Sequence, residues 1–379
     1  MQFIDLKKQQ ERIREKIESR IKNVLNSGQY IMGPEIKELE KKLAEYTGAR
    51  HAIGCASGTD ALLMALMAYE VGPGDAVFTT PFTFVATAEV ISLLGATPVF
   101  VDIEPGTFNI DPEKLEQTII AVEHSGKPGY PLPIGADGLV PKGVIPVDLF
   151  GQTANYARIN ETAEKHGLFV IEDACQSFGA EYKGQKACSL ADIACTSFFP
   201  AKPLGCYGDG GMVFTDDDEL AKKMISIRVH GSGTDKYDNI RLGINGRLDT
   251  MQAAILLAKF EIFTEEIELR QVAANRYSKL LKDSVTAPFI ADGCKSAWAQ
   301  YCLLCDNREE LTAKLKEQGI PTAIYYPIPL HLQGAYKYLG YEKGSFPVSE
   351  RIAERIFSIP MHPYLTEEDQ KAIASVIAG

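Results

Sequence analysis

Short apolar runs alternate with stretches of helical periodicity through most of the chain. Before residue 50 the pattern differs, with a charged amphipathic helix at the start, a Gly-rich turn, and a second helix from Pro34 to about Tyr46. The apolar runs that follow have the length of buried strands. They occur at His51 to Cys55, Ala76 to Thr79, Thr97 to Val101, Gly143 to Val147, Leu168 to Ile171, Ile193 to Phe198 and Gly211 to Phe214. This alternation predicts an α/β fold with a mainly parallel, seven-stranded sheet covered by helices on both faces.

The second half of the chain contains one unusually long helix pattern. From Arg247 to about Leu281 apolar residues recur at helical spacing, and neither proline nor glycine interrupts them. Beyond it the pattern predicts a strand near Tyr301, a helix near 309–318, a strand near 322–326 and two further helices. We therefore expect a large domain over residues 1–255 and a smaller C-terminal α/β domain over residues 256–379, joined by the long helix. The Gly- and Pro-rich stretch 125–138 carries no periodicity and is expected to be a surface excursion.

Charge and hydropathy exclude several classes of protein. The formal net charge of −11 argues against nonspecific binding to nucleic acid, which depends on clustered basic residues. The stretch 76–101 is apolar enough to resemble a membrane span, but Pro81, Gly95 and Pro98 divide it into strand, helix and strand. The charged N-terminal segment does not resemble a secretory signal. We expect a cytoplasmic protein with no membrane insertion.

The eight cysteines give no sign of a disulfide framework, because they are scattered through apolar segments. Cys302 and Cys305 form the one C-x-x-C pair, within a strand-like run that has no second pair of ligands. Buried strand thiols are the better interpretation, and the sequence predicts no metal site.

Lys202 carries the most specific chemical signal. It follows Ser197-Phe-Phe-Pro-Ala and precedes Pro203-Leu-Gly and the Gly-rich stretch Gly208-Asp-Gly-Gly211. Its apolar neighbours disfavour the ammonium form and lower the pKa of the amine, as Schiff-base formation with an aldehyde requires. A solitary lysine is usually a solvated loop residue. In this setting the residue indicates pyridoxal phosphate (PLP) chemistry.

Two further motifs strengthen that interpretation. Asp173 closes the strand that begins near Leu168, at the strand end where ligands meet an open α/β sheet, and a carboxylate there could keep a pyridine nitrogen protonated. Gln176 follows one helical turn later and could reach the ring hydroxyl. Ser57-Gly-Thr59 opens an apolar helix, where backbone N–H groups can hold a phosphate. Taken singly, the aspartate and the serine could equally be helix caps.

Through these motifs the sequence resembles the DegT/StrS-type nucleotide-sugar aminotransferases, which are fold-type I PLP enzymes. Further matching segments are Phe3 to Leu6, Gly28 to Pro34, Pro81 to Thr87, Glu172 to Gly179 and Asn245 to Gln252. The resemblance implies that Lys202 forms the Schiff base, Asp173 faces the ring nitrogen and Gln176 lies near the ring hydroxyl. It assigns the phosphate to Gly58, Thr59 and Ser197, and ring stacking to Phe84. It also implies a homodimer in which Asn245 reaches the phosphate of the partner subunit.

The resemblance extends to enzymes that aminate UDP-2-acetamido-2-deoxy-3-oxo-glucuronate with L-glutamate for bacterial surface polysaccharide such as O-antigen. The segments Thr196 to Gly211 and Tyr326 to Leu330 carry it. Cations in the stretch 228–247 are candidates for the anionic sugar, Arg247 first among them, because arginine pairs well with carboxylate, but each could equally be a solvated surface charge. Tyr325 and Tyr326 are further candidate sugar contacts, although the resemblance leads us to expect a histidine at position 325 in relatives that handle hexuronates. The prediction is a ping-pong transamination in which pyridoxamine phosphate (PMP) carries the amine.

Three alternatives stay open at this stage. The substrate could be another 3- or 4-keto nucleotide sugar. The reaction could be a dehydration that removes a hydroxyl with the same fold and an aminated cofactor, although relatives of that kind generally carry histidine in place of the lysine. The chain could instead be a regulatory protein that binds cofactor without turnover, a class in which degraded active-site motifs would be expected. The motifs here are intact.

Overall fold

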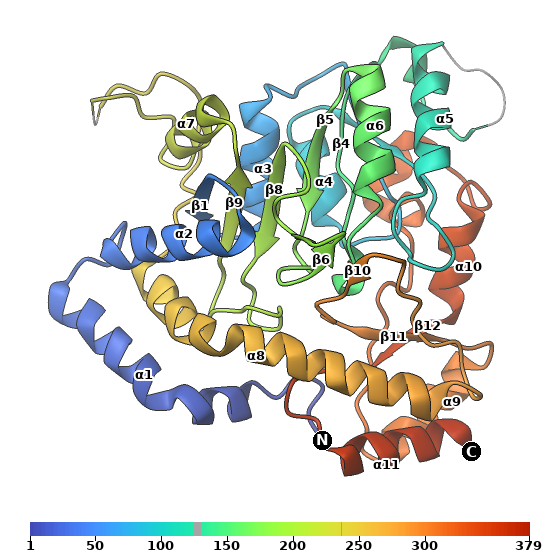
Figure 1. The fold of residues 1–379 in the computed structure, drawn as a ribbon. Helices are drawn as coiled ribbons and strands as arrows, with labels where there is room; N and C mark the ends of the chain where they lie inside the picture. Colours follow the sequence, from blue (N-terminus) through green and yellow to red (C-terminus); the bar gives the residue numbers. More distant parts are fainter. Residues whose placement is uncertain (125–129, 236) are drawn as a thin grey trace.

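The computed structural model describes residues 1–124, 130–235 and 237–379. Its centre is a seven-stranded sheet in the order β1-β9-β8-β5-β4-β2-β3 (Figure 1). The strands, in that order, are His51–Cys55, Gly211–Thr215, Ile193–Ser197, Phe169–Asp173, Val140–Val144, Asp75–Thr79 and Thr97–Phe100. Strand β9 is antiparallel to both of its neighbours, and the other adjacent pairs are parallel. The mainly parallel, seven-stranded sheet that the sequence predicts is confirmed.

One strand differs from its prediction by three residues. The sequence pattern placed it at 143–147, whereas β4 covers Val140–Val144. The reason is Pro146, which has no N–H group to continue a regular ladder. The chain nevertheless stays beside its neighbours, since Ile145 donates to the carbonyl of Phe78 and Asp173 donates to that of Pro146. Of the predicted excursion 125–138, residues 125–129 lie outside the described part of the chain, and residues Ala136–Gly138 form a single 3-10 turn.

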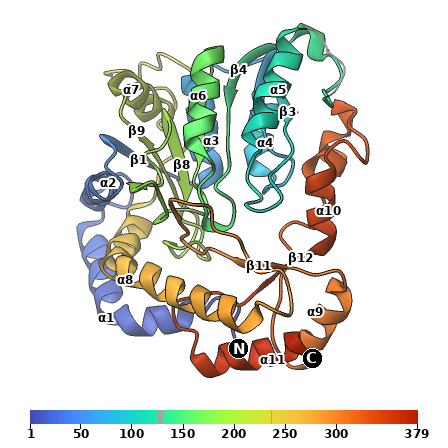
Figure 2. The same cartoon turned by 45° about the vertical axis from the view of Figure 1, so that its right-hand side comes forward.

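Helices cover both faces of the sheet, as strands with alternating buried side chains require (Figures 1 and 2). Val77, Ile171 and Val213 pack with α3, α4 and α7 on one face. Phe78, Val170 and Phe214 point to the other face, where α2, α5, α6 and α8 pack. The helices are α1 Leu6–Ser27, α2 Pro34–Thr47, α3 Gly58–Ala68, α4 Ala86–Leu93, α5 Pro112–Glu123, α6 Tyr156–His166, α7 Asp218–Ile227, α8 Thr250–Leu281, α9 Arg308–Glu317, α10 Pro347–Arg355 and α11 Glu367–Ala378.

The long helix α8 contributes side chains to two cores. Leu256 and Phe263 pack in the cluster under the sheet, whereas Tyr277 and Leu281 pack with the C-terminal strands β11 (Tyr301–Leu304) and β12 (Ile356–Ile359) and with α9 and α11. The strand expected near 322–326 is reduced to a bridge between Ala323 and Ser358. The sequence pattern missed β12, which continues directly from α10. The division of the chain at residue 255 stays a prediction.

The remaining features of the fold are a small second sheet and the state of the cysteines. Short strands β6 (Glu181–Tyr182), β7 (Gln185–Lys186) and β10 (Cys294–Lys295) form a separate three-stranded sheet. All eight cysteines are free thiols. Across the described residues, we find no helix with the length and apolar character needed to cross a membrane.

Candidate active site

A cavity of about 760 Å³ lies at the carboxyl ends of the parallel strands. Val147 follows β4, Asp173 ends β5 and Ser197 ends β8, and all three line the cavity. This is the edge of an α/β sheet at which ligands usually bind. Further wall residues come from the start of α3, from the segment 83–87 before and within α4, and from the C-terminal segment 324–333.

The fold brings together most of the residues that the sequence singled out. Nine of them line this cavity: Gly58, Thr59, Phe84, Asp173, Gln176, Ser197, Lys202, Tyr325 and Tyr326. Asn245 and Arg247 are not among its lining residues. They lie on an extended segment in which Arg247 pairs with Cys55 of β1, and the Arg247 guanidinium donates to the Asn245 side chain at 2.5 Å. Asn245 is exposed.

The start of α3 forms one end of the site. Ser57 caps the helix by accepting a hydrogen bond from the N–H of Asp60 at 3.0 Å. Glycine is needed at position 58, because a Cβ there would lie 2.7 Å from the Cβ of Ser197 and 2.9 Å from the Sγ of Cys175. Glycine therefore lets the first helical turn approach β8 closely. The leading N–H groups of a helix have no partner within the helix and favour an anion.

Asp173 is held at the other end of the site by two donors. The hydroxyl of Thr87 donates to its Oδ2 at 2.8 Å, and the N–H of Cys175 donates to its Oδ1 at 3.2 Å. The aspartate is 4% exposed. A buried carboxylate with a hydrogen bond to each oxygen has a defined orientation, and its remaining acceptor positions are available to a cationic group in the cavity.

Lys202 stands on a tight turn after β8. Its N–H donates to the carbonyl of Phe199, and the N–H of Cys206 closes the turn onto Phe198. Burial lowers the pKa of the Lys202 amine, and the nearby Cys175 and Asp173 oppose that effect only in part. The amine is therefore a better nucleophile than an ordinary lysine, as the sequence predicts.

Gln176 links the sheet to the C-terminal segment. Its Oε1 accepts from the N–H of Phe150 at 2.8 Å, which defines the orientation of the amide, and its Nε2 donates to the hydroxyl of Tyr326 at 3.2 Å. One N–H of the amide is left for a ligand. The ring of Phe84 lies 6.4 Å from that of Tyr326, and Phe84 is 56% exposed.

The wall of the cavity is poor in positive charge. Among the described residues that line it, Lys202 is the one cation, whereas Asp173 and Asp209 are acidic. Of the candidate cations in the stretch 228–247, Arg228 is committed elsewhere. It is 5% exposed and donates to the Oε1 of Glu40 at 2.7 Å and to the carbonyl of Gly54 at 2.9 Å. Arg228 thus ties the end of α7 to α2 and β1 and is unavailable to a substrate.

Replacing Arg228 with methionine is expected to lower the free energy of unfolding by roughly 2–3 kcal/mol, because Glu40 and the carbonyl of Gly54 lose a buried, charged donor. Denaturant unfolding measures this change. Arg158→Met is the matched control, since that side chain is 51% exposed and its ion pair with Glu161 lies at the surface. An unchanged unfolding midpoint in Arg228→Met, with a raised KM for a sugar substrate, would contradict the structural role.

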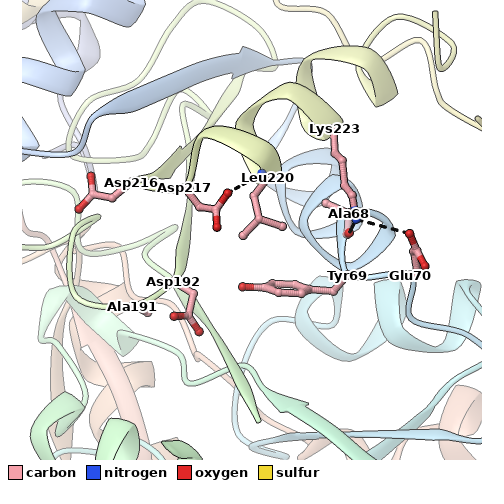
Figure 3. A pocket seen from close by; sticks show the side chains of 9 residues that line it. All are labelled: Ala68, Tyr69, Glu70, Ala191, Asp192, Asp216, Asp217, Leu220 and Lys223. Carbon is pink, nitrogen blue, oxygen red and sulfur yellow. Dashed lines mark hydrogen bonds and ion pairs between the residues drawn. The ribbon is translucent and has the colours of Figure 1, made fainter. Parts of the chain in front are cut away.

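A second hollow of about 750 Å³ lies at the opposite edge of the sheet, where β8 begins and β9 ends (Figure 3). Its polar side chains are largely engaged with one another or with the backbone. Asp217 caps α7 by accepting from the N–H groups of Glu219 and Leu220, and Lys223 pairs with Glu70 at 3.4 Å. None of the predicted site residues lines this hollow.

Comparison with known proteins decides the family. The model of the DegT/DnrJ/EryC1/StrS aminotransferase family matches residues 11–378. The chain belongs to this family. A relative from Pseudomonas aeruginosa, named UDP-2-acetamido-2-deoxy-3-oxo-D-glucuronate aminotransferase, is 51% identical over 100% of both chains. A Geobacillus stearothermophilus relative named pleiotropic regulatory protein is 45% identical over 99% of this chain and 97% of its own.

Solved structures share this fold along almost the whole chain, among them a DegT/DnrJ/EryC1/StrS aminotransferase. One from Brucella abortus has a TM-score of 0.95 and 51% identity, and the match covers 100% of this chain and 98% of that one. NtdA from Bacillus subtilis, solved with bound PMP, has a TM-score of 0.84 and 31% identity over 97% of this chain and 82% of its own. The predicted fold class and the prediction of a PLP-dependent aminotransferase are confirmed.

The residues present fit PLP. The Gly58 turn offers an anion site at the start of α3, Asp173 offers an oriented carboxylate, and Lys202 offers an amine of lowered pKa, all on the wall of one cavity. The groups are those that a phosphorylated pyridine aldehyde requires, namely a phosphate cradle, a partner for the ring nitrogen and a nucleophile.

Sequence reasoning missed two features around this site. Thr87 lies in a segment that carried the family resemblance, but nothing in the sequence shows that its hydroxyl meets Asp173. The second feature is a pair of fully buried carboxyl groups, Asp148 and Glu172, and burial raises the pKa of both. Glu172 precedes Asp173 on β5, so the alternation of a strand turns it to the opposite face.

Proposed function

We propose that this protein transfers an amino group from L-glutamate to a keto nucleotide sugar, with UDP-2-acetamido-2-deoxy-3-oxo-glucuronate as the sugar. One observation carries the proposal: Lys202, Asp173 and the start of α3 surround a single cavity in a chain that matches the Pseudomonas aeruginosa aminotransferase along its whole length. The 51% identity supports the same sugar. The wider role that we propose is the synthesis of bacterial surface polysaccharide, including O-antigen.

We propose a role for each of the predicted cofactor-binding residues that line the cavity. PLP, when bound, supplies an aldehyde that exchanges its oxygen for an amine and a ring that withdraws electrons from the reacting carbon. Lys202 presents its amine to that aldehyde and, once released, moves a proton at Nζ between substrate and cofactor carbons. Asp173 keeps the proton on the ring nitrogen. Gln176 donates to the ring hydroxyl, and Phe84 covers the ring. Gly58, Thr59 and Ser197 hold the phosphate.

The charge of the cavity supports a homodimer with composite sites. A cofactor phosphate, the two carboxylates of glutamate and the diphosphate and carboxylate of the sugar all need cations, and Lys202 is the one cation among the described lining residues. Asn245 of the partner subunit would reach the phosphate. Arg247 of the partner subunit would pair with an anionic part of the substrate. Tyr325 and Tyr326 are the proposed sugar contacts within the same chain.

The proposed compartment is the cytoplasm. All eight cysteines are free thiols, and six of them are buried. Proteins of oxidising compartments commonly use such residues in disulfides, so the cysteine pattern favours a reducing environment.

Adding L-glutamate alone to the PLP-loaded protein is expected to bleach its visible absorbance band, because the amine passes to the cofactor and leaves PMP. Absorbance spectroscopy before and after the addition measures this half-reaction, and 2-oxoglutarate should be released in the same amount. The Lys202→Ala variant is the control. If the band persists after glutamate is added, glutamate is not the amino donor. If no band forms when PLP is added, the proposed aminotransferase reaction is wrong.

The product formed from the keto sugar distinguishes an aminotransferase from a dehydratase and from a regulatory protein. Mass spectrometry of the product from PMP-loaded protein should show an amino sugar. A deoxy sugar would instead establish a dehydratase. A protein that binds cofactor but fails with every amino donor would support a regulatory role, which is the function named for the Geobacillus stearothermophilus relative.

A further inference from the structure

We propose that Thr87 is a positioning residue that holds the Asp173 carboxylate toward the ring nitrogen and so keeps the proton on the ring. This inference rests on the proposed function and deepens it, because it assigns the electron-withdrawing power of the ring to a residue that does not itself contact the nitrogen. Thr87 lies in the second position of α4, so a helix on one face of the sheet reaches a carboxylate at the end of β5.

The direction of the hydrogen bond follows from the chemistry of the partners. Thr87 is 1% exposed and Asp173 is 4% exposed, so little water competes for the contact of 2.8 Å. A carboxylate ion can only accept, so the Thr87 hydroxyl must donate. Its lone pairs then accept from the hydroxyl of Thr83, which lies 3.3 Å away and is itself 2% exposed. Thr83, Thr87 and Asp173 form a one-way chain of donors that ends on Oδ2.

Thr87 also connects two of the proposed cofactor contacts. Its backbone N–H donates to the carbonyl of Phe84 at 3.4 Å, and Phe84 is the residue expected to cover the ring. The same residue therefore relates the ring-covering side chain to the carboxylate that meets the ring edge. Because the Cys175 N–H restrains the other oxygen of Asp173, loss of the Thr87 hydroxyl would free the carboxylate to rotate about its Oδ1 contact.

The surroundings of Asp173 make this donor important. Behind it lie the buried carboxyl groups of Asp148 and Glu172, and the N–H of Asp148 donates to the carbonyl of Asp173 at 3.0 Å. Burial raises the pKa of Asp148 to about 7 and the pKa of Glu172 well above its usual value, which is consistent with a proton shared between them. Two acidic groups therefore lie close to Asp173, and the Thr87 hydroxyl is the side-chain donor that holds the Asp173 carboxylate in place beside them.

The test measures the ring nitrogen directly. Wild type, Thr87→Val, Thr87→Ser and Thr83→Val are loaded with PLP that carries ¹⁵N in the ring, and the ¹⁵N chemical shift is recorded across pH. Wild type and Thr87→Ser should keep the shift of a protonated ring. In Thr87→Val the ¹⁵N chemical shift should change to that of a neutral ring at a lower pH than in the other proteins. Its kcat should fall roughly tenfold to a hundredfold, the value of a hydrogen bond to a charged group, while KM for glutamate changes little.

Thr83→Val removes the donor to Thr87 and leaves the contact between Thr87 and Asp173 in place. Its ¹⁵N titration should therefore lie between those of wild type and Thr87→Val. If Thr87→Val does not fold, Thr87→Ala takes its place in the comparison with Thr87→Ser. An unchanged ¹⁵N titration in the folded valine or alanine variant would overturn the proposal, and so would a kcat loss that serine does not rescue. Failure of wild type to bind PLP or to respond to glutamate would instead reject the proposed function.

Discussion

Replacing Lys202 with alanine is expected to reduce turnover of glutamate and keto sugar by at least about a thousandfold. In the proposed mechanism the variant loses both the amine that bonds the cofactor and the base that moves the substrate proton. Burial lowers the pKa of this amine, and no other lysine lines the described part of the cavity, so no neighbour can replace it. Steady-state kinetics measures the loss. The visible band of the Lys202-bound cofactor should vanish in the same variant, although PLP can still be retained through the phosphate and ring contacts.

Two variants separate the chemistry of Lys202 from its charge and from general damage. Lys202→Arg keeps a cation but not a nucleophilic amine, so it should be as inactive as Lys202→Ala. Lys222→Ala on α7 is the surface control, since that side chain is 71% exposed, and it should match wild type. Full turnover in Lys202→Ala would end the aminotransferase hypothesis. Partial rescue by added small amines would strengthen it.

The sheet could be predicted from the sequence because its strands are buried on both faces. A strand with apolar side chains in both directions reads as a continuous run, and β1 and β8 were found to within a residue in this way. The errors arose where that signal is weak. Pro146 ends a regular ladder inside an apolar run, so β4 was placed too late. Strand β12 follows α10 with no turn residue between them, so the sequence gives no sign of where the helix ends and the strand begins.

In the candidate site, too, the residues in local motifs could be predicted from the sequence, whereas contacts between distant segments could not. Lys202 and Asp173 stand in short motifs from which a cofactor role could be predicted for both residues. The partner of Asp173 could not be read from the sequence, because Thr87 lies 86 positions away and meets it only after α4 docks on the sheet. Arg228 illustrates the opposite error. Its position among basic residues indicated a role with the substrate, whereas the fold buries it against Glu40.

The roles that we propose for Asn245 and Arg247 require a second subunit, and one cross-complementation experiment tests them. Asn245→Asp places a carboxylate where the proposed site needs a phosphate contact, so its homodimer should be nearly inactive, as should that of Lys202→Ala. Coexpression of the two variants should restore activity. In a mixed dimer one site carries both changes and the other carries neither. Random pairing makes half of the dimers mixed, so about a quarter of wild-type activity should return.

The outcome depends on which chain supplies each residue. If Lys202 and Asn245 served the site of one chain, every site in a mixed dimer would carry one change and no activity would return. Differently tagged chains allow the mixed dimer to be isolated, and a mixed dimer of Lys202→Ala with wild type, expected to show half of full activity, controls for assembly. Full activity of the Asn245→Asp homodimer would remove Asn245 from the site altogether. Repeating the experiment with Arg247→Ala should restore activity with the keto sugar, because this arginine lies on the same segment of the partner subunit and would supply a cation that the wall of a single chain does not provide.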